Sequence, residues 1–384
     1  MAARTIVVLG GGTGGIIAAR GIRRRVEAAD RVVVVDRTPT FEFAPSFLWV
    51  MTGARRAAQV CVERARLRRR GIEILEADVV EIDAAHRRVK THDGDLGFDR
   101  LLVALGAELA PHALAGFADA AHNIYTLDGA TAAGKALAEI REGRVVVLVS
   151  RLPYKCPAAP YETAFLTEAL LRQRGVRDHT AIDVYTPEPL PMPTAGPALG
   201  EALRAMLAER GIGFHPEHTI DRIDPDTHEL IFTNQQRAGF DVLLGVPPHQ
   251  PPEVIAASEL AGDTGFVPVD RATLATNIDG VYAIGDVTTI PIAGGKFLPK
   301  AGVFAEGEAD VVARNLGAEL AGRTPVVAFD GKGACFVELG DRRAAFATGD
   351  FYAPDTPHVQ LRRPGPHWHL AKIAFEKYWM QRWF

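Results

Sequence analysis

The turn that follows a predicted strand at residues 144–150 contains Cys156, the residue of this chain best suited to chemistry. The turn reads Arg151-Leu-Pro-Tyr-Lys-Cys-Pro-Ala-Ala-Pro160 and precedes a predicted helix over residues 161–174. A dinucleotide site would need glycines here, because a pyrophosphate must approach the N–H groups at the helix N-terminus. Three prolines instead remove N–H donors, and the thiol lies beside Lys155. Because a cation and a helix N-terminus both lower a thiol pKa, we expect Cys156 to be reactive rather than a buried structural cysteine.

A glycine-rich turn near the N-terminus predicts the dinucleotide site that the Cys156 turn lacks. Residues 6–9 form a short apolar strand, and a helix is predicted over residues 16–24. The next strand, residues 31–35, ends at Asp36, where an acid can bind a ribose hydroxyl. The glycines with the fingerprint spacing are Gly10, Gly12 and Gly15. Because strand, glycines, helix, strand and acid follow in this order, we expect a bound adenine dinucleotide.

Downstream segments complete this site. Residues 276–286 predict a strand ending in Gly285-Asp286, which resembles the strand that delivers an aspartate to the FAD ribityl chain in flavoproteins with two dinucleotide-binding domains. Lys300 and the helix that begins around Gly302 are suited to stabilise the negative charge of a reduced flavin. Residues 98–106 match the strand and Ala104-x-Gly106 turn that close the FAD domain in the same superfamily. We therefore predict FAD as the cofactor.

These motifs predict an α/β fold with two Rossmann-like domains, similar to that of glutathione reductase, followed by a C-terminal strand segment and a terminal amphipathic helix. A second domain carrying Cys156 interrupts the FAD domain, and the C-terminal segment carries Cys335. A hairpin is also expected from residues 74–83 and 87–90. The predicted boundaries are residues 1–111 and 265–322 for the FAD domain, 112–264 for the second domain and 323–384 for the C-terminal segment.

Composition restricts the classes of function. A formal net charge of −4 over 384 residues gives no reason to expect a nucleic-acid partner. Three cysteines are too few for a disulfide scaffold, and we expect Cys61, on an arginine-rich helix, to be structural. No apolar run approaches the ~18 residues needed to span a bilayer, and no metal site is indicated. The chain enters a strand within five residues of Met1, leaving no room for a signal peptide, so cytoplasmic-side synthesis is expected.

Four further segments, together with the dinucleotide motifs, resemble the sulfide:quinone oxidoreductase family along essentially the whole chain. The segments are Lys155-Cys156-Pro157-Ala-Ala-Pro160-Tyr-Glu162, Phe41-Glu-Phe-Ala-Pro45-Ser46, Gly333-Ala-Cys335 and Phe375-Glu-Lys-Tyr378. The flavoprotein subunit of flavocytochrome c sulfide dehydrogenase is a close relative, but that subunit would need an export signal. The resemblance implies that the chain oxidises sulfide, reduces a quinone and yields sulfane sulfur or polysulfide.

The resemblance also assigns roles to residues. It implies that Cys156 and Cys335 bridge over one flavin face, that Cys335 captures the sulfur and that Cys156, as the lower-pKa leaving thiol, passes electrons to FAD. Glu162 would exchange protons, although a first-turn Glu can also simply complement the helix dipole. Phe336 and Tyr378 are the implied quinone contacts. The implied cofactor contacts beyond those above are Arg37, Pro45 and Val79.

The chain departs from the family pattern at two places. Some members hold FAD through a cysteine upstream of the first catalytic one, whereas residues 122–127 contain none, so we expect non-covalent FAD. Some members carry a histidine after the second strand of the inserted domain, and residues 189–196 contain none. The subfamily and the details of the quinone site therefore stay open, as does the oligomeric state, a homo-oligomer included.

Residues 368–384 combine aromatic rings at helical spacing with Lys372, Lys377 and Arg382. This composition predicts an interfacial helix that holds the protein peripherally on a membrane, with its cations toward anionic lipid. The alternative is a C-terminal helix docked on its own domain or on a partner.

Two other classes of protein compete with this interpretation. A type II NADH:quinone dehydrogenase would share the fold, the FAD and a membrane helix, but it would need a glycine fingerprint where this chain has Pro153 to Pro160. A non-catalytic FAD-bearing sensor or interaction protein would keep the dinucleotide motifs without needing Cys156, Cys335 and Glu162 together.

Overall fold

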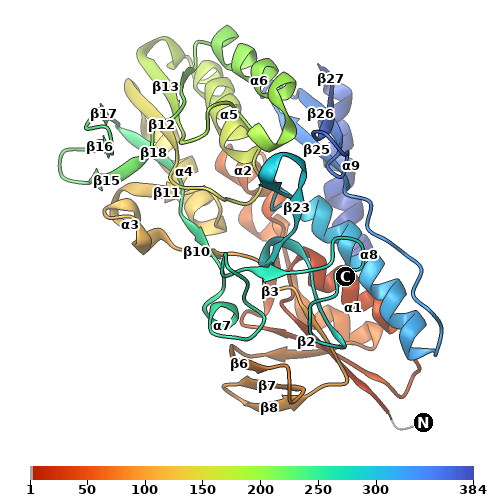
Figure 1. Ribbon diagram of the computed structural model, residues 1–384. Coiled ribbons are helices and arrows are strands. Elements are labelled where there is room, and N and C mark those ends of the chain that lie inside the picture. Colours follow the sequence, from red (N-terminus) through yellow and green to blue (C-terminus); the bar gives the residue numbers. More distant parts are fainter. Residues whose placement is uncertain (1–2) are drawn as a thin grey trace.

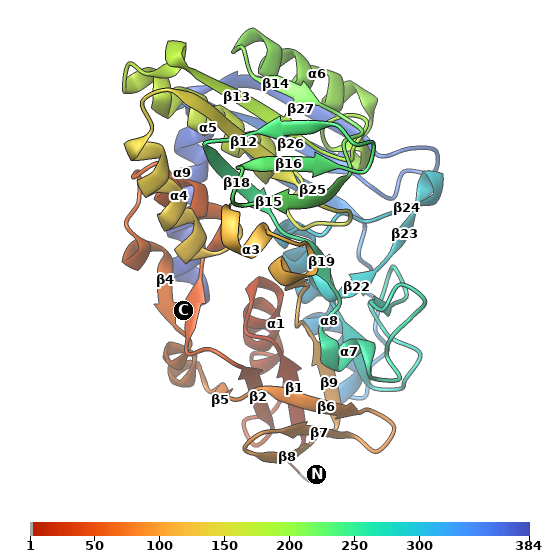
Figure 2. The same ribbon diagram turned by 90° about the vertical axis from the view of Figure 1, so that its left-hand side faces the viewer.

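Two five-stranded parallel sheets form the body of the protein, and the computed structural model describes them within residues 3–384 (Figures 1 and 2). The first sheet has the order β21-β9-β1-β2-β5, with bounds Val281–Ala283, Arg100–Val103, Thr5–Leu9, Arg31–Asp36 and Glu73–Glu76. The second has the order β11-β18-β12-β13-β14, with bounds Ala121–Asn123, Val242–Val246, Gly143–Val149, Thr180–Tyr185 and Gly213–His215. Because β21 follows the second sheet along the chain, the first sheet is assembled from two segments that flank the second.

The central strand of the first sheet is apolar throughout because both of its faces are buried. On β1, Ile6 and Val8 pack toward α1 (Thr13–Arg23) and α8 (Gly302–Leu320), whereas Val7 packs toward the opposite face. That opposite face is covered by a three-stranded meander of β6 (Val79–Asp83), β7 (Arg88–Thr91) and β8 (Gly94–Gly97). Parallel strands covered on both faces require such unbroken apolar runs.

The second sheet is built in the same way around β12. Val145 and Val147 pack toward one face and Val146 toward the other. The first face carries the helices α4 (Leu127–Glu139), α5 (Ala159–Gln173) and α6 (Pro197–Glu209). The second carries the antiparallel strands β15 (Ile220–Asp224), β16 (Glu229–Phe232) and β17 (Arg237–Gly239). Ligands of such sheets bind at the carboxyl ends of the central strands. The two candidate positions are therefore the turn at Gly10, which follows β1, and the Cys156 turn, which follows β12.

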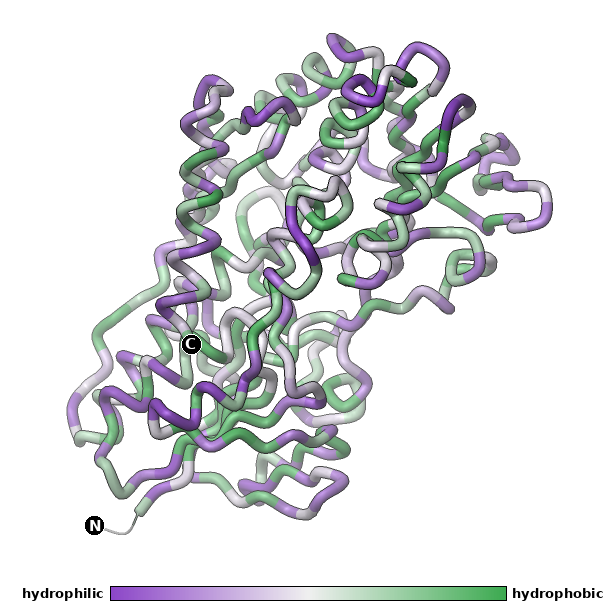
Figure 3. Tube along the Cα trace, turned by 180° about the vertical axis from the view of Figure 1, so that it is seen from behind, coloured by the Kyte–Doolittle hydropathy of each residue, from purple (hydrophilic) through white to green (hydrophobic). Residues whose placement is uncertain are grey.

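The C-terminal segment adds an antiparallel sheet of β25 (Lys332–Glu338), β26 (Ala344–Asp350) and β27 (His358–Gly365), followed by α9 (Pro366–Trp383). The helix is confirmed, but its burial differs from that of an amphipathic helix. Hydrophilic and hydrophobic residues are interspersed along it (Figure 3), and its buried residues include Lys372 and Glu376 beside Trp379 and Trp383. Trp379 stacks on Phe41 with ring centroids 5.1 Å apart, so α9 is docked on the first domain.

The remaining elements are short and connect the larger ones. They are the strand pairs β3 (Thr40–Glu42) with β4 (Cys61–Glu63), β10 (Glu108–Leu109) with β19 (His249–Gln250), β20 (Val267–Pro268) with β22 (Thr288–Thr289) and β23 (Pro291–Ile292) with β24 (Lys296–Phe297), and the helices α2 (Phe47–Met51), α3 (Phe117–Ala120) and α7 (Glu253–Ala256). Across residues 3–384, no helix is both long enough and apolar enough to cross a bilayer.

Two local expectations are corrected. Cys61 begins strand β4 instead of lying on an arginine-rich helix, and the arginines follow it in a 3₁₀ helix at Arg64–Arg70. Residues 73–76 pair with β2 in the parallel sheet, so only the second half of the expected hairpin, from Val79 onward, is antiparallel. In both cases short apolar and basic runs carried too little periodicity to separate strand from helix or one sheet from another.

Candidate active site

A cavity of about 750 Å³, the dinucleotide cavity, opens at the carboxyl ends of β1, β2 and β21. Nine of the predicted cofactor residues line it: Gly10, Gly12, Asp36, Pro45, Ala104, Gly106, Gly285, Asp286 and Gly302. Among the described residues 3–384, the lining does not include the four other predicted cofactor residues, Gly15, Arg37, Val79 and Lys300. Glu162, Lys155 and Cys156 line it as well, which brings the Cys156 turn to the same space.

The fingerprint glycines serve different purposes. A Cβ on Gly15 would lie 1.8 Å from the carbonyl oxygen of Gly10, so this glycine lets α1 pack against the turn. Gly10 has a φ of +98°, and a Cβ there would meet the carbonyl oxygen of Ala104 at 2.3 Å. A Cβ on Gly12 would meet no atom of the described residues within 4 Å. Gly12 therefore leaves free space on the cavity side, where a pyrophosphate can approach the backbone.

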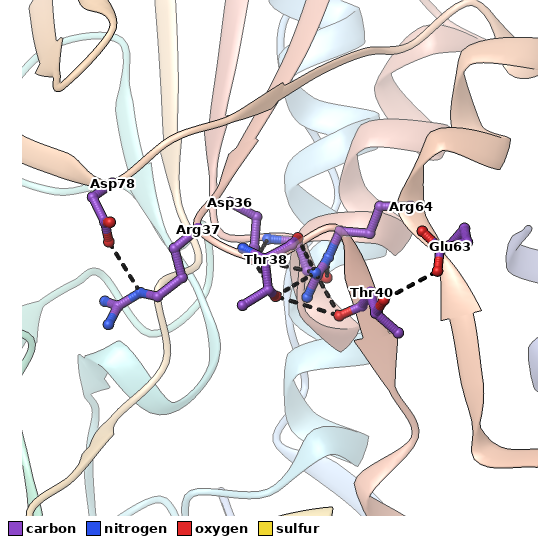
Figure 4. A network of polar contacts seen from close by, with 8 residues as sticks. Asp36, Arg37, Thr38, Thr40, Glu63, Arg64 and Asp78 are labelled. Atoms are coloured by element: carbon purple, nitrogen blue, oxygen red, sulfur yellow. Dashed lines mark hydrogen bonds and ion pairs between the residues drawn. The ribbon is translucent and has the colours of Figure 1, made fainter. Parts of the chain in front are cut away.

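Arg64, which the sequence did not single out, holds the acid at the end of β2 in place (Figure 4). Its buried guanidinium pairs with Asp36 Oδ1 at 3.2 Å and donates through Nε to the carbonyl oxygen of Gly11 at 2.8 Å. The N–H of Gly11 donates to Asp36 Oδ2 at 2.7 Å. Arg37 instead extends away from Asp36 toward Asp78, with 3.5 Å between Nε and Oδ1. Only the tertiary fold shows that Arg64, 28 residues after Asp36, is its partner.

The side chain of Asp286 shows whether the cavity could accept the ribityl chain of a flavin. Its Oδ1 is buried and has no hydrogen-bond partner among the described residues. Burial raises the pKa of this carboxyl, and the charges of Lys155 and Lys300 oppose that rise. An unpartnered buried carboxylate oxygen is costly unless a ligand hydroxyl donates to it. The cavity residues therefore fit the predicted dinucleotide.

Lys300 is placed differently from the expectation. Its ammonium donates to the carbonyl oxygens of Asp286 and Thr288, at 2.6 and 3.0 Å, and lies 3.5 Å from the ring centroid of Phe266. Burial lowers its pKa to about 8. The backbone carbonyl of Lys300 accepts the N–H of Cys156 at 2.7 Å, so Lys300 anchors the turn. Sequence alone could not reveal that backbone carbonyls compete for its ammonium.

Cys156 separates the dinucleotide cavity from a second one. The thiol chamber, about 470 Å³ in volume, is lined by both Cys156 and Cys335. Its walls are mostly apolar and include Leu199, Val303, Phe304, Phe351 and Val359. Cys156 and Cys335, like Cys61, are free thiols in the structure. Cys156 has a φ of +52°, and its carbonyl accepts the hydroxyl of Tyr125 at 3.2 Å, which holds the residue at the partition between the two spaces.

The expected low pKa of Cys156 is wrong. Burial, followed by the charge of Glu162, raises its pKa to about 12. Burial also raises the pKa of Cys335, and Cys156 and Glu162 add to that rise. The cation that favours both thiolates is Lys372 on α9, not the sequence neighbour Lys155, which faces the dinucleotide cavity. Helix α5 begins at Ala159, and the backbone N–H of this residue lowers the pKa of Cys156 as a helix N-terminus should, but burial outweighs that effect.

Glu162 is bound by two partners from the C-terminal segment. Its Oε1 accepts the ammonium of Lys372 at 3.0 Å and the backbone N–H of Glu338 at 2.8 Å. Lys372 is 8% exposed, so it does not face solvent as the interfacial-helix expectation required. Lys372 and Glu376 share one helical spacing with the buried Trp379 and Trp383, and this spacing could have indicated that both charges lie on the buried face of α9.

Phe336 and Tyr378 are linked through a third aromatic residue. Phe336 packs on Phe346 and on Phe375, with ring centroids 4.9 and 6.2 Å apart, and Phe375 lies one turn before Tyr378 on α9. Tyr378 is 56% exposed. Neither Phe336 nor Tyr378 is among the described residues that line the dinucleotide cavity or the thiol chamber, so a quinone role for them stays a prediction.

Buried side chains occupy the position where a second dinucleotide would bind. Glu188 follows β13 and accepts hydrogen bonds through Oε2 from Tyr154 at 3.0 Å, from Thr186 at 3.1 Å and from Tyr161. Tyr154 belongs to the proline-rich turn and Tyr161 to the first turn of α5. Phenol rings and a carboxyl group are therefore bonded together between the strand end and the helix N-terminus, and two of these residues, Tyr154 and Glu188, also line the thiol chamber.

Comparisons with known proteins agree with this architecture. The profile of the family described as pyridine nucleotide-disulphide oxidoreductase matches residues 4–149 and 168–309. The mitochondrial sulfide:quinone oxidoreductase of Mus musculus is 25% identical over 91% of this chain and 78% of its own. The sulfide-quinone reductase of Aquifex aeolicus is 27% identical over 98% and 90%. The crystal structure of the Aquifex aeolicus sulfide:quinone oxidoreductase superposes with a TM-score of 0.89 and 26% identity, over 99% of this chain and 91% of that chain.

Proposed function

Because the chain belongs to the pyridine nucleotide-disulphide oxidoreductase family, we propose that it is an FAD-dependent sulfide:quinone oxidoreductase. The observation that carries the proposal is the position of Cys156, which lines both the dinucleotide cavity and the chamber that Cys335 shares. Both cysteines lie outside the segments that the family profile matches, so they distinguish this chain from a generic member. Relatives along nearly the whole chain act on sulfide and quinone by name.

The two cysteines supply the sulfide chemistry. Hydrosulfide attacks the sulfur of Cys335 in a Cys156–Cys335 disulfide; the S–S bond breaks, Cys335 becomes a persulfide and Cys156 leaves as a thiolate. The Cys156 thiolate and the Cys335 persulfide then join through the extra sulfur atom, which releases two electrons; FAD held in the dinucleotide cavity would supply the two-electron acceptor for this stage. Transfer of that sulfur atom to a further hydrosulfide or polysulfide ion restores the disulfide, and quinone takes the electrons from the enzyme. The sum is HS⁻ + quinone + H⁺ → sulfane sulfur + quinol.

The thiol chamber is suited to the sulfur product. Sulfane sulfur is uncharged and apolar, and the chamber walls around Cys335 are mostly aliphatic and aromatic. Lys372 offsets the high pKa of Cys156 and stabilises the leaving thiolate, which is the role that the sequence had given to Lys155. We propose Glu162 as the acid–base group beside the flavin, because it lines the dinucleotide cavity and is bonded to Lys372.

Sulfide, but not NADH, is expected to bleach the flavin absorbance of the purified protein. NADH needs a glycine turn whose amides can face its pyrophosphate, whereas Tyr154, Tyr161 and Glu188 are hydrogen-bonded together at that position here. Anaerobic titration with each reductant measures this directly. Bleaching by NADH at a comparable rate would favour the type II NADH dehydrogenase alternative. Failure of both reductants would favour the non-catalytic FAD-binding alternative.

We propose that FAD is held non-covalently. A cysteine-linked flavin would need a thiol along the cavity wall, and Cys156, the cysteine that lines the cavity, is committed to sulfide chemistry in this mechanism. Residues 122–127, where other members carry the linking cysteine, contain none. The residues that would hold the cofactor through hydrogen bonds are Asp36 and Asp286, with the amides of the glycine turn and of the α8 N-terminus.

We propose peripheral membrane association through the exposed side of α9, close to the quinone contacts. Leu370 and Tyr378 are 64% and 56% exposed, and the exposed cations Lys377 and Arg382 lie beside them. Apolar side chains flanked by cations suit a surface of anionic lipid. Phe336, the residue after Cys335 on β25, packs on Phe375 of α9, which supports a quinone contact at Phe336 and Tyr378.

The double variant Leu370→Glu, Tyr378→Glu is expected to sediment with anionic vesicles several-fold less than the wild type, because two carboxylates repel the lipid surface. Flavin reduction by sulfide should be unchanged. Deleting α9 would be uninformative, since Trp379 and Trp383 belong to the core. Val326→Glu, at an exposed apolar residue beyond α8, is the matched control. Equal sedimentation of all three proteins would contradict a role for this side of α9.

A further inference from the structure

We propose that His369, Glu338 and Lys372 form a proton path from the protein surface to Glu162. The proposal deepens the proposed function and rests on it, since each hydrosulfide oxidised with quinone consumes one proton from water. The reacting groups are enclosed: Glu162 is 5% exposed and Glu338 1%. A proton that reaches them must therefore travel through groups of the protein or through enclosed water.

The path begins at the edge of α9. The side chain of His369 is 17% exposed, and its Nδ1 lies 3.0 Å from Oε2 and 3.1 Å from Oε1 of Glu338. Among residues 3–384, His369 is the residue that hydrogen-bonds to the carboxylate of Glu338. Imidazole can take a proton from water on one nitrogen and pass one to a carboxylate from the other. His369 and Glu338 are thus placed as entry and first acceptor.

Lys372 connects the first acceptor to the reaction site. Its ammonium is bonded to Glu162 Oε1 at 3.0 Å, and the backbone N–H of Glu338 donates to the same oxygen at 2.8 Å. Lys372 follows His369 by three residues, so both side chains leave the same face of α9. The ring of Trp49 packs against both, at 5.8 Å from the imidazole and 5.0 Å from the ammonium. In the proposed path, rotation of the flexible lysine chain carries the ammonium from Glu162, to which it is bonded, toward the carboxylate of Glu338, on which its charge already acts.

The charges around the path suit proton exchange. Burial raises the pKa of Glu338, while Lys372 and His369 oppose that rise and Glu162 adds to it. Glu162 and Glu338 hold the pKa of Lys372 above its usual value in spite of its burial. Titratable groups from three parts of the chain face the path: Cys156 and Glu162 from the turn before α5 and its first turn, Cys335 and Glu338 from β25, and His369 and Lys372 from α9. Arg55 packs over the ring of Trp49. The ammonium of Lys372 is bonded to Glu162, and its charge also acts on Glu338, so two carboxyl groups lie in the field of one ammonium and the cluster can hold one additional proton.

A neighbouring ion pair on the same helix shows what a purely structural arrangement looks like. Glu376, one turn after Lys372, accepts two-pronged hydrogen bonds from Arg55 at 2.7 to 3.1 Å and the hydroxyl of Ser46 at 2.6 Å. Both of its oxygens are satisfied by donors that do not lose protons near neutral pH. Glu338 is instead bonded to a histidine, a side-chain type whose ring nitrogens can accept and donate protons.

The test is His369→Ala, assayed with sulfide and a soluble quinone from pH 6 to pH 9. We expect kcat to fall about 10-fold or more, with the KM for sulfide unchanged. The defect should grow as the pH rises, because protons become scarcer, and added imidazole should restore kcat. His367→Ala removes an exposed histidine two residues earlier and is the matched control. Wild-type kcat in His369→Ala, or a defect that imidazole leaves unchanged, would overturn the path.

Glu338→Gln keeps the shape of the side chain and provides a second measurement. It should slow turnover at least as much as His369→Ala, and imidazole should not restore it, because the acceptor itself is lost. The double variant should be no slower than Glu338→Gln, since the two residues act in series. Additive losses would show two independent structural effects and overturn the proposal. If the wild-type protein itself fails to turn over sulfide, the proposed function fails, whereas normal turnover in both variants removes only the path.

Discussion

Replacing either Cys156 or Cys335 with serine is expected to abolish flavin reduction by sulfide while leaving FAD bound. Hydroxyl groups cannot form the S–S bond that hydrosulfide attacks, so the loss should be at least about a thousand-fold. The flavin should stay, because Cys335 lies outside the dinucleotide cavity and Cys156 contributes one side chain to its wall. The double variant should be little slower than either single one, since the two thiols act as a unit.

Stopped-flow absorbance of the flavin at saturating sulfide measures this effect. Cys61→Ser is the matched control: the thiol of Cys61 donates to the carbonyl oxygen of Ala57 at 3.2 Å, and this residue lines neither cavity of the described chain. Burial and the charges of Glu42 and Glu63 raise its pKa, and Lys372, the cation that favours the other two thiolates, does not act on it. Reduction at the wild-type rate in Cys335→Ser would refute the two-cysteine mechanism.

The second large effect is expected in the glycine turn, where two alanine substitutions should fail for different reasons. Gly15→Ala places a Cβ 1.8 Å from the carbonyl oxygen of Gly10, so α1 must move away from β1. We expect a loss of stability of about 3 kcal/mol, the upper end of overpacking costs, together with loss of flavin. Gly12→Ala meets no described atom within 4 Å, so its fold should be retained. Its methyl group occupies the space that a pyrophosphate approaches, and flavin affinity should fall.

Thermal unfolding followed by circular dichroism, with and without added FAD, separates the two cases. Gly12→Ala should unfold at the temperature of the flavin-free wild-type protein and regain flavin only at high FAD concentration. Gly15→Ala should unfold at a lower temperature than the flavin-free wild type. Equal stability and flavin content in the two variants would mean that the turn does not approach the cofactor closely at Gly12.

Local patterns determined the scaffold from sequence alone. The spacing of Gly10, Gly12 and Gly15 between an apolar strand and a helix predicts a tight strand-to-helix turn, because the conformation of that turn depends on these few neighbouring residues. Nine of the predicted cofactor residues line one cavity, because a strand end and its following turn are near neighbours in both sequence and space. The identity of Cys156 and Cys335 as candidate partners came from the family resemblance, and the structure places both in one chamber.

Only the tertiary structure decided the electrostatics of the site. Lys155 adjoins Cys156 in sequence, yet the cation that acts on the thiol is Lys372, which the fold brings from the last helix to bond Glu162 across 210 residues. Arg64 supports Asp36 in the same non-local way. A pKa depends on burial and on charges in every element packed around the group, and neither can be derived from residues next to it in the chain. Cys156 was therefore found by its sequence, whereas its raised pKa follows from the enclosed space and the distant residues around it.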